Sequence, residues 1–174
     1  MADSNHIQQS LDAALVGYLN LSASSMAEIN YLLAHHEDDS NQYWRRTFIR
    51  AAWSLIDGDI YALKEMCRSV KELRADVIKN SDEELLSSDR QETGDKIKGV
   101  LKLARTIFDL PITLDFAGTE WATVGLAIEK RHNIVHPKSV DTLVITDDQW
   151  KQQKEAIGWF LSTSSSLLVA LEEK

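Results

Sequence analysis

The residues with the clearest chemical potential lie together in the segment Glu-Lys-Arg-His-Asn-Ile-Val-His-Pro, residues 129–137. It places Arg131, His132, Asn133 and His136 within about a turn and a half of a helix. Side chains four residues apart share a helix face, so His132 and His136 are expected to lie side by side, with Arg131 about 100° away. Imidazoles exchange protons near neutral pH. The spacing therefore predicts a pocket bordered by a guanidinium and two proton-transfer groups.

The end of this helix is expected at Pro137, next to His136. The last carbonyls of a helix lack partners within the helix, and the negative end of the helix dipole favours a cationic side chain. His136 is therefore the leading candidate for proton transfer. Phosphate-binding loops, dinucleotide-binding glycine patterns, nucleophile elbows and paired metal-binding cysteines are absent from the sequence. No cofactor is expected.

Other interpretations of these residues remain open at this point. His136 and Lys138 are also the residues expected simply to compensate a helix C-terminus, with Arg131 paired to an acid such as Asp57. Zinc binding by His132 and His136 would need further ligands, and no acid or thiol lies nearby in the sequence. No metal site is predicted.

Further candidate residues lie outside this segment. The run of histidines and acids at residues 35–39 has the composition of a metal site, but its place on a polar turn favours solvated side chains. Cys67 lies on an apolar helical stripe and is expected in the core. Arg45, Arg46 and Arg50 are expected either to extend a basic patch toward a phosphate backbone or to form ordinary helix salt bridges. Most tryptophans are expected in the core, with Trp121 the candidate for stacking on a base.

Helices are the elements that must position these residues. The chain has 174 residues with only two prolines and seven glycines, and apolar residues recur every three or four positions. We expect a helix from residue 3 or 4 to 33, broken or divided near Ser22, and a long helix from Tyr43 to about Asn80. Capping patterns predict helix starts at Ser81 and Thr146, the latter helix ending near residue 171. Further helices are expected over 95–109 and 116–135, with extended pieces at 112–114 and 142–146.

The fold class that follows is all-α, an antiparallel bundle of four to six helices in a single domain spanning residues 1–174. Acidic residues number 27 against 19 Lys and Arg, a net charge of −8, which argues against nonspecific coating of nucleic acid but leaves room for a small basic cleft. The single cysteine and the lack of a leader pattern predict a cytoplasmic protein. No apolar run is long enough to cross a membrane.

At Arg131 to His136 the sequence resembles the HEPN superfamily (higher eukaryote and prokaryote nucleotide-binding). These helical bundles carry an arginine, a polar residue, a few mostly apolar residues and a histidine near the end of a late helix. His132 takes the polar position, where the family commonly has Asn, Asp or His. A second likeness is Ser54-Leu55-Ile56-Asp57, similar to the family's small-apolar-apolar-acidic segment. Asp57 falls on a polar strip of the long helix with Arg50 and Lys64, whereas Asp59 falls on the apolar side and is expected as a satisfied polar residue inside the bundle.

The resemblance implies a metal-independent endoribonuclease of the toxin or phage-defence type, with the motifs of a homodimer facing a shared cleft and RNA as substrate. His136 would act as base or acid, Arg131 would hold the phosphate, and His132 or Asn133 would orient substrate or carry the second proton. Asp57, Arg50 and Lys138 would help to bind or orient the RNA. A cognate antitoxin or other protein partner is expected, with no membrane association. The alternative is an inactive HEPN module that binds a nucleotide or a protein partner in a regulatory role.

Overall fold

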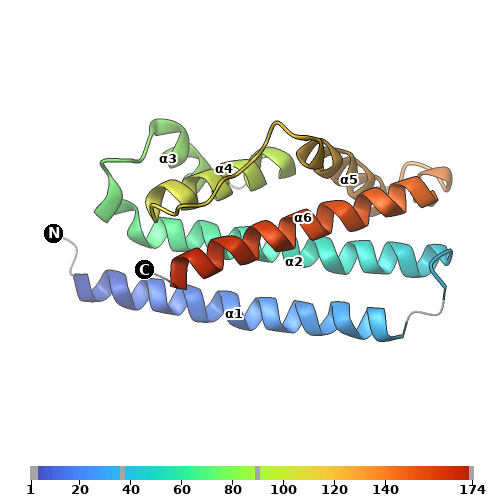
Figure 1. The fold of residues 1–174 in the computed structure, drawn as a ribbon, viewed down its shortest axis with the longest axis horizontal. Helices are drawn as coiled ribbons and strands as arrows, with labels where there is room; N and C mark the ends of the chain where they lie inside the picture. The colour runs from blue at the N-terminus through green and yellow to red at the C-terminus, as the bar shows by residue number, and fades with distance from the viewer. Residues whose placement is uncertain (1–3, 36–37, 89–90, 173–174) are drawn as a thin grey trace. The chain divides into compact units, whose positions relative to one another are not determined.

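The computed structural model describes residues 4–35, 38–88 and 91–172, and these residues form helices and connecting segments with no strand. The protein is an all-α helical bundle, as the sequence predicts (Figure 1). Six α-helices and two 3₁₀ helices make up the described part. The α-helices are α1 (Ser4–Ala34), α2 (Gln42–Val70), α3 (Asn80–Ser87), α4 (Thr93–Ile107), α5 (Thr119–Val135) and α6 (Asp147–Glu172). The 3₁₀ helices are η1 (Lys71–Arg74) and η2 (Asp141–Leu143).

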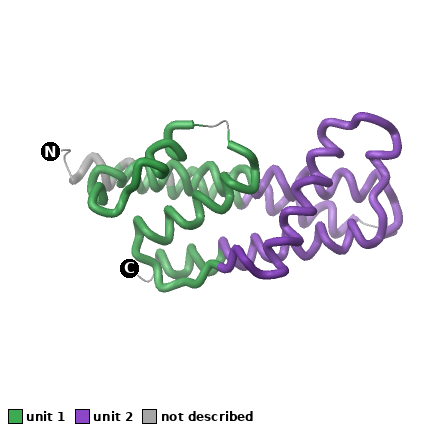
Figure 2. The backbone as a smooth tube through the Cα atoms, turned by 90° about the horizontal axis from the view of Figure 1, so that it is seen from above, with its two compact units in different colours: residues 1–22, 57–114, 165–174 green, residues 23–56, 115–164 purple. Residues whose placement is uncertain are grey.

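The helices contribute to two compact units, which Figure 2 colours separately. Unit 1 comprises residues 1–22, 57–114 and 165–174, and unit 2 comprises residues 23–56 and 115–164. The boundaries fall inside α1, α2 and α6, so each of these helices contributes to both units. The predicted motif on α5 lies wholly within unit 2.

Unit 2 shows how neighbouring helices run in opposite directions. The indole of Trp44, near the start of α2, donates to the carbonyl of Leu32 near the end of α1. The segment between α5 and α6, residues 136–146, is called the connector below. Arg46 on α2 donates to the Leu143 carbonyl in the connector, and Arg50, one turn later on α2, donates to the Ile134 carbonyl in α5. The order of these contacts shows that α2 and α5 run in opposite directions. The core between them is apolar and aromatic, because the first half of α2 has apolar residues around most of its circumference. Its fully buried members include Ile49, Ala52, Trp53 and Leu55.

Several element boundaries differ from the sequence prediction. The first helix is continuous through Ser22, because serine is a moderate helix former and the segment holds no proline. The second ends at Val70, ten residues before Asn80, where η1 follows without a single buried side chain, so no apolar face sustains a longer helix. Residues 141–143 form η2 where an extended piece was expected, since the Thr142 hydroxyl donates to the Ser139 carbonyl at 2.7 Å and favours a turn.

The starts of α6 and α3 carry hydrogen bonds between side chains and backbone amides. At the start of α6 the Thr146 hydroxyl accepts from the Gln149 amide at 3.2 Å, and the Gln149 side chain accepts from the Thr146 amide at 3.1 Å, which confirms the predicted capping box. For α3 the cap lies two residues earlier than predicted. There the carboxylate of Asp82, not Glu84, accepts from a backbone amide, that of Lys79, at 2.8 Å.

The polar strip predicted along α2 is only partly exposed. Arg50, Ser54 and Tyr61 face solvent and Asp57 is half-buried, but Lys64 is fully buried. Its ammonium donates to the carbonyl of Ser88 at 2.8 Å. Ser88 lies 24 residues further along the chain, so the helical periodicity of α2 does not reveal this contact. Among the described residues, no helix is long and apolar enough to cross a membrane.

Candidate functional site

The two motif histidines lie side by side at the C-terminal end of α5. Their ring centroids are 5.1 Å apart, and both side chains are exposed. The backbone amide of His136 donates to the carbonyl of His132 at 2.8 Å, so the last helical turn is intact up to the residue before Pro137. Arg131 and Asn133 flank this pair and are half-buried. The last turn of α5 thus presents two accessible imidazoles next to a guanidinium-bearing residue.

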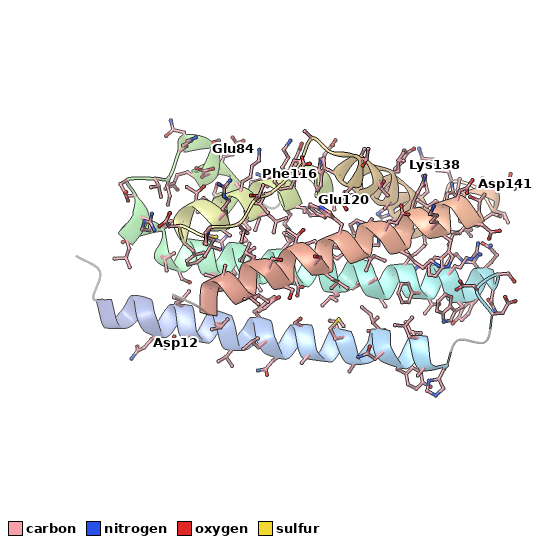
Figure 3. The ribbon with its side chains drawn as sticks, viewed as in Figure 1. Asp12, Glu84, Phe116, Glu120, Lys138 and Asp141 are labelled. Carbon is pink, nitrogen blue, oxygen red and sulfur yellow. The ribbon has the colours of Figure 1, made fainter. Side chains whose placement is uncertain are left out.

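Arg50 fixes this helix end from α2. Its Nη2 donates to the carbonyl of Ile134 at 3.2 Å, one of the last carbonyls of α5, which lack intrahelical partners. The structure therefore brings Arg50 to the motif, through the helix backbone. Lys138 is exposed on the connector after α5, where Figure 3 labels it with Asp141. Asp57 belongs to unit 1, whereas the other six predicted site residues belong to unit 2.

Lys130 is a structural part of the site that the helical periodicity of the sequence does not reveal. Its side chain is only 8% exposed, and its ammonium donates to the carbonyls of Thr142 at 3.0 Å and Val144 at 2.6 Å. Burial lowers the pKa of Lys130. Lysines are usually exposed, so no local pattern marks this one as buried. Its position next to Arg131 makes it a clamp between the motif helix and the connector that carries Lys138.

The same connector is held from the other side by the first turns of α2. Gln42 forms a two-way pair with the backbone of Ile145, donating to its carbonyl at 2.9 Å and accepting from its amide at 2.7 Å. Arg45 donates to the Ile145 carbonyl at 2.7 Å and to the Asp147 carboxylate at 2.6 Å, and Arg46 donates to the Leu143 carbonyl at 3.2 Å. Arg45 is buried, so it supports the connector from within. The basic patch considered for phosphate binding is thus engaged with backbone carbonyls.

A glutamine joins the motif helix to its neighbours in the core of unit 2. Gln153 on α6 is fully buried; its amide oxygen accepts from the Trp53 indole at 2.8 Å, and its amide nitrogen donates to the Ala127 carbonyl at 2.8 Å. One side chain therefore connects α2, α5 and α6. This bridge sets the distance of α5 from the two helices against which it packs.

Trp121 lies at the opposite end of α5 from the histidines. It is eleven positions before His132, roughly 16 Å along a helix. It is half-buried in an aromatic cluster with Phe116, at a ring distance of 4.9 Å, and Trp159, at 5.3 Å. Figure 3 labels Phe116 and Glu120 at this end of the helix. The cluster accounts for Trp121 as a packing residue.

The remaining chemical candidates have structural roles. His35 stacks on Tyr31 at a ring distance of 4.0 Å, and one of its ring nitrogens lies 2.8 Å from the Tyr31 carbonyl. His36 and Glu37 lie outside the described residues. Burial raises the pKa of Cys67 to about 12, which leaves an unreactive thiol in the core, as the apolar stripe predicts. Among the side chains that the structure describes, no three from His, Cys, Asp or Glu are grouped to hold a metal ion.

Comparison of the chain with models of known protein families finds no match, and comparisons with curated proteins and with solved structures find no significant similarity. The function is therefore inferred from the residues of this chain and from the geometry at the end of α5.

Proposed function

We propose that the protein is a metal-independent endoribonuclease of the HEPN type. The observation that supports this most is the pair of exposed imidazoles, His132 and His136, 5.1 Å apart on the turn that also carries Arg131. Paired proton carriers beside a cation are the groups that cleavage of a ribose phosphodiester requires.

In the proposed reaction His136 takes the proton from a ribose 2′-hydroxyl, and the resulting oxygen attacks the adjacent phosphorus. Arg131 stabilises the negative charge of the pentacoordinate phosphorane through two parallel hydrogen bonds. The bond from phosphorus to the 5′-oxygen breaks, and a protonated imidazole, His132 or the same group of a second copy, gives that oxygen a proton. The products carry a 2′,3′-cyclic phosphate and a 5′-hydroxyl. No electrons are transferred, so the reaction needs no redox cofactor.

The supporting residues have complementary tasks in this proposal. Asn133 and Lys138 orient the RNA backbone, and Arg50 contributes charge while holding the helix end through Ile134. Asp57 stays a predicted residue for binding or orienting the RNA. A homodimer in the cytoplasm, with two motifs sharing one cleft, completes the proposal, together with a toxin or phage-defence role and a cognate antitoxin.

The test is incubation of the purified protein with mixed cellular RNA in EDTA, which suppresses metal-dependent contaminants. Wild-type protein is expected to cleave, and Arg131→Ala and His136→Ala are each expected to lose at least a hundredfold in rate, since a general base alone contributes about that much. His35→Ala is the matched control, because it removes an exposed histidine of the same unit far along the sequence. Equal rates in all four proteins would refute the site. Lack of cleavage across several RNA classes would favour the inactive nucleotide- or partner-binding module.

A further inference from the structure

Asp59 is an acid placed in the apolar core of unit 1. It lies in the middle of α2 with only 5% of its surface exposed, next to Ile60 and within a helical turn of Leu63, both buried. The hydroxyl of Tyr18, on α1, forms a hydrogen bond with its carboxyl group. Its Oδ1 has no hydrogen-bond partner among the described residues. This differs from the fully satisfied polar residue that the sequence predicts.

The charges around Asp59 do not compensate it. Among the described ionisable side chains of unit 1, only Tyr18, Lys64 and Cys67 are also buried. The Lys64 ammonium donates to the Ser88 carbonyl, and helix geometry places it about 140° around α2 from Asp59. The ionisable side chains of α3 and α4 are exposed or half-exposed, and residues 165–171 of α6 contain none. Burial raises the pKa of Asp59 to about 7, and the Tyr18 hydrogen bond opposes this rise only in part.

The part of α1 that belongs to unit 1 meets the buried acid through Tyr18. Of its described side chains, Tyr18 alone is buried, at 5% exposure. Val16 and Leu19, its apolar neighbours, are each more than half exposed. Leu11 and Leu15 are half-buried, so Tyr18 is the most deeply buried described side chain of this segment, and its hydroxyl meets the buried acid.

We propose that proton binding by Asp59 controls the docking of α1 residues 9–22 in unit 1. With the proton bound, the neutral carboxyl group is tolerated beneath Tyr18. When the proton is lost, the carboxylate has no cation and one unpaired oxygen, and water reaches it once Tyr18 moves away. The segment is then docked at mildly acidic pH and released at mildly alkaline pH. This inference is independent of the proposed ribonuclease activity.

Amide hydrogen exchange of residues 11–20 tests the proposal, after correction for the intrinsic pH dependence of exchange. In wild-type protein we expect protection of these amides to fall about tenfold between pH 6 and pH 8, because each pH unit above the pKa of the docked state disfavours docking tenfold. Asp59→Asn is expected to keep the protection at both pH values. Asp57→Asn, a half-buried acid two residues away on α2, is the control and should behave as wild type.

A second measurement uses the wild-type protein alone and does not depend on the folding of a variant. The carboxyl carbon of Asp59 and the backbone amides of residues 11–20 are followed by NMR through a pH titration. The proposal predicts a common midpoint near pH 7. Titration of Asp59 near pH 4, or protection of α1 that falls equally in Asp59→Asn, would overturn the proposal.

Discussion

Replacing Gln153 by leucine tests how the motif helix is held in place. The amide makes two hydrogen bonds of 2.8 Å, to the Trp53 indole and the Ala127 carbonyl, in a region that water does not reach. Leucine fills a similar volume but leaves the indole N–H without an acceptor, at a cost of about 1–3 kcal/mol. The Ala127 carbonyl keeps its hydrogen bond within α5, so losing the bond from Gln153 adds a smaller cost to the free energy of unfolding. We expect Gln153→Leu to lower the free energy of unfolding by about 2–4 kcal/mol.

Thermal and urea unfolding provide the assay. A loss of this size corresponds to a fall in Tm of roughly 5–12 °C for a chain of this length. Gln152→Leu is the matched control, a half-exposed neighbour expected to change stability by less than about 0.5 kcal/mol. Adding Trp53→Phe removes the stranded donor, so the double variant should be at least about 1 kcal/mol more stable than the sum of the single changes predicts. Strict additivity, or equal effects at residues 152 and 153, would refute the reasoning.

Three further predictions concern other supports of the fold. Lys130→Met should lower the free energy of unfolding by about 2–3 kcal/mol in urea, because the Thr142 and Val144 carbonyls lose a charged donor. The same change should speed tryptic cleavage after Lys138. Lys130→Arg should show smaller effects in both assays, because arginine keeps a charged donor. Asp109→Gly should raise stability by about 1 kcal/mol in the same assay, because Asp109 has a φ of 50° at the end of α4; a loss would contradict this. Asp59 has a higher pKa folded than unfolded, so stability is lost as pH rises from about 4 to about 7. Asp59→Asn should therefore stabilise the protein by up to about 4 kcal/mol at pH 8 and little at pH 4, in unfolding curves at both pH values.

The helices could be predicted because their signals are local. Apolar spacing and the scarcity of proline and glycine indicated the six helices, and the capping pair Thr146 and Gln149 fixed one start correctly. The end of α2 was predicted ten residues too late, since periodicity continued past Val70 although nothing there is buried. The shared face of His132 and His136 also follows from spacing alone.

The supports of the site could not be predicted in the same way. Lys130, Arg45 and Gln153 act through partners that lie far away in the sequence or in an irregular connector, and their types favour exposure on average. Tertiary packing decided their burial. A buried polar residue on an otherwise apolar face, such as Asp59, was recognisable from the helix wheel, but its unpaired oxygen was not.

The chemical nature of the ends of RNA fragments tests the central proposal most directly. Fragments produced in EDTA are analysed for their 3′ and 5′ groups, with the His136→Ala protein assayed alongside. Attack by the 2′-hydroxyl predicts 2′,3′-cyclic phosphates and 5′-hydroxyls, both missing when His136 is replaced. Fragments with 5′-phosphates and 3′-hydroxyls, or cyclic phosphates formed equally by the His136→Ala protein, would contradict the role proposed for the end of α5.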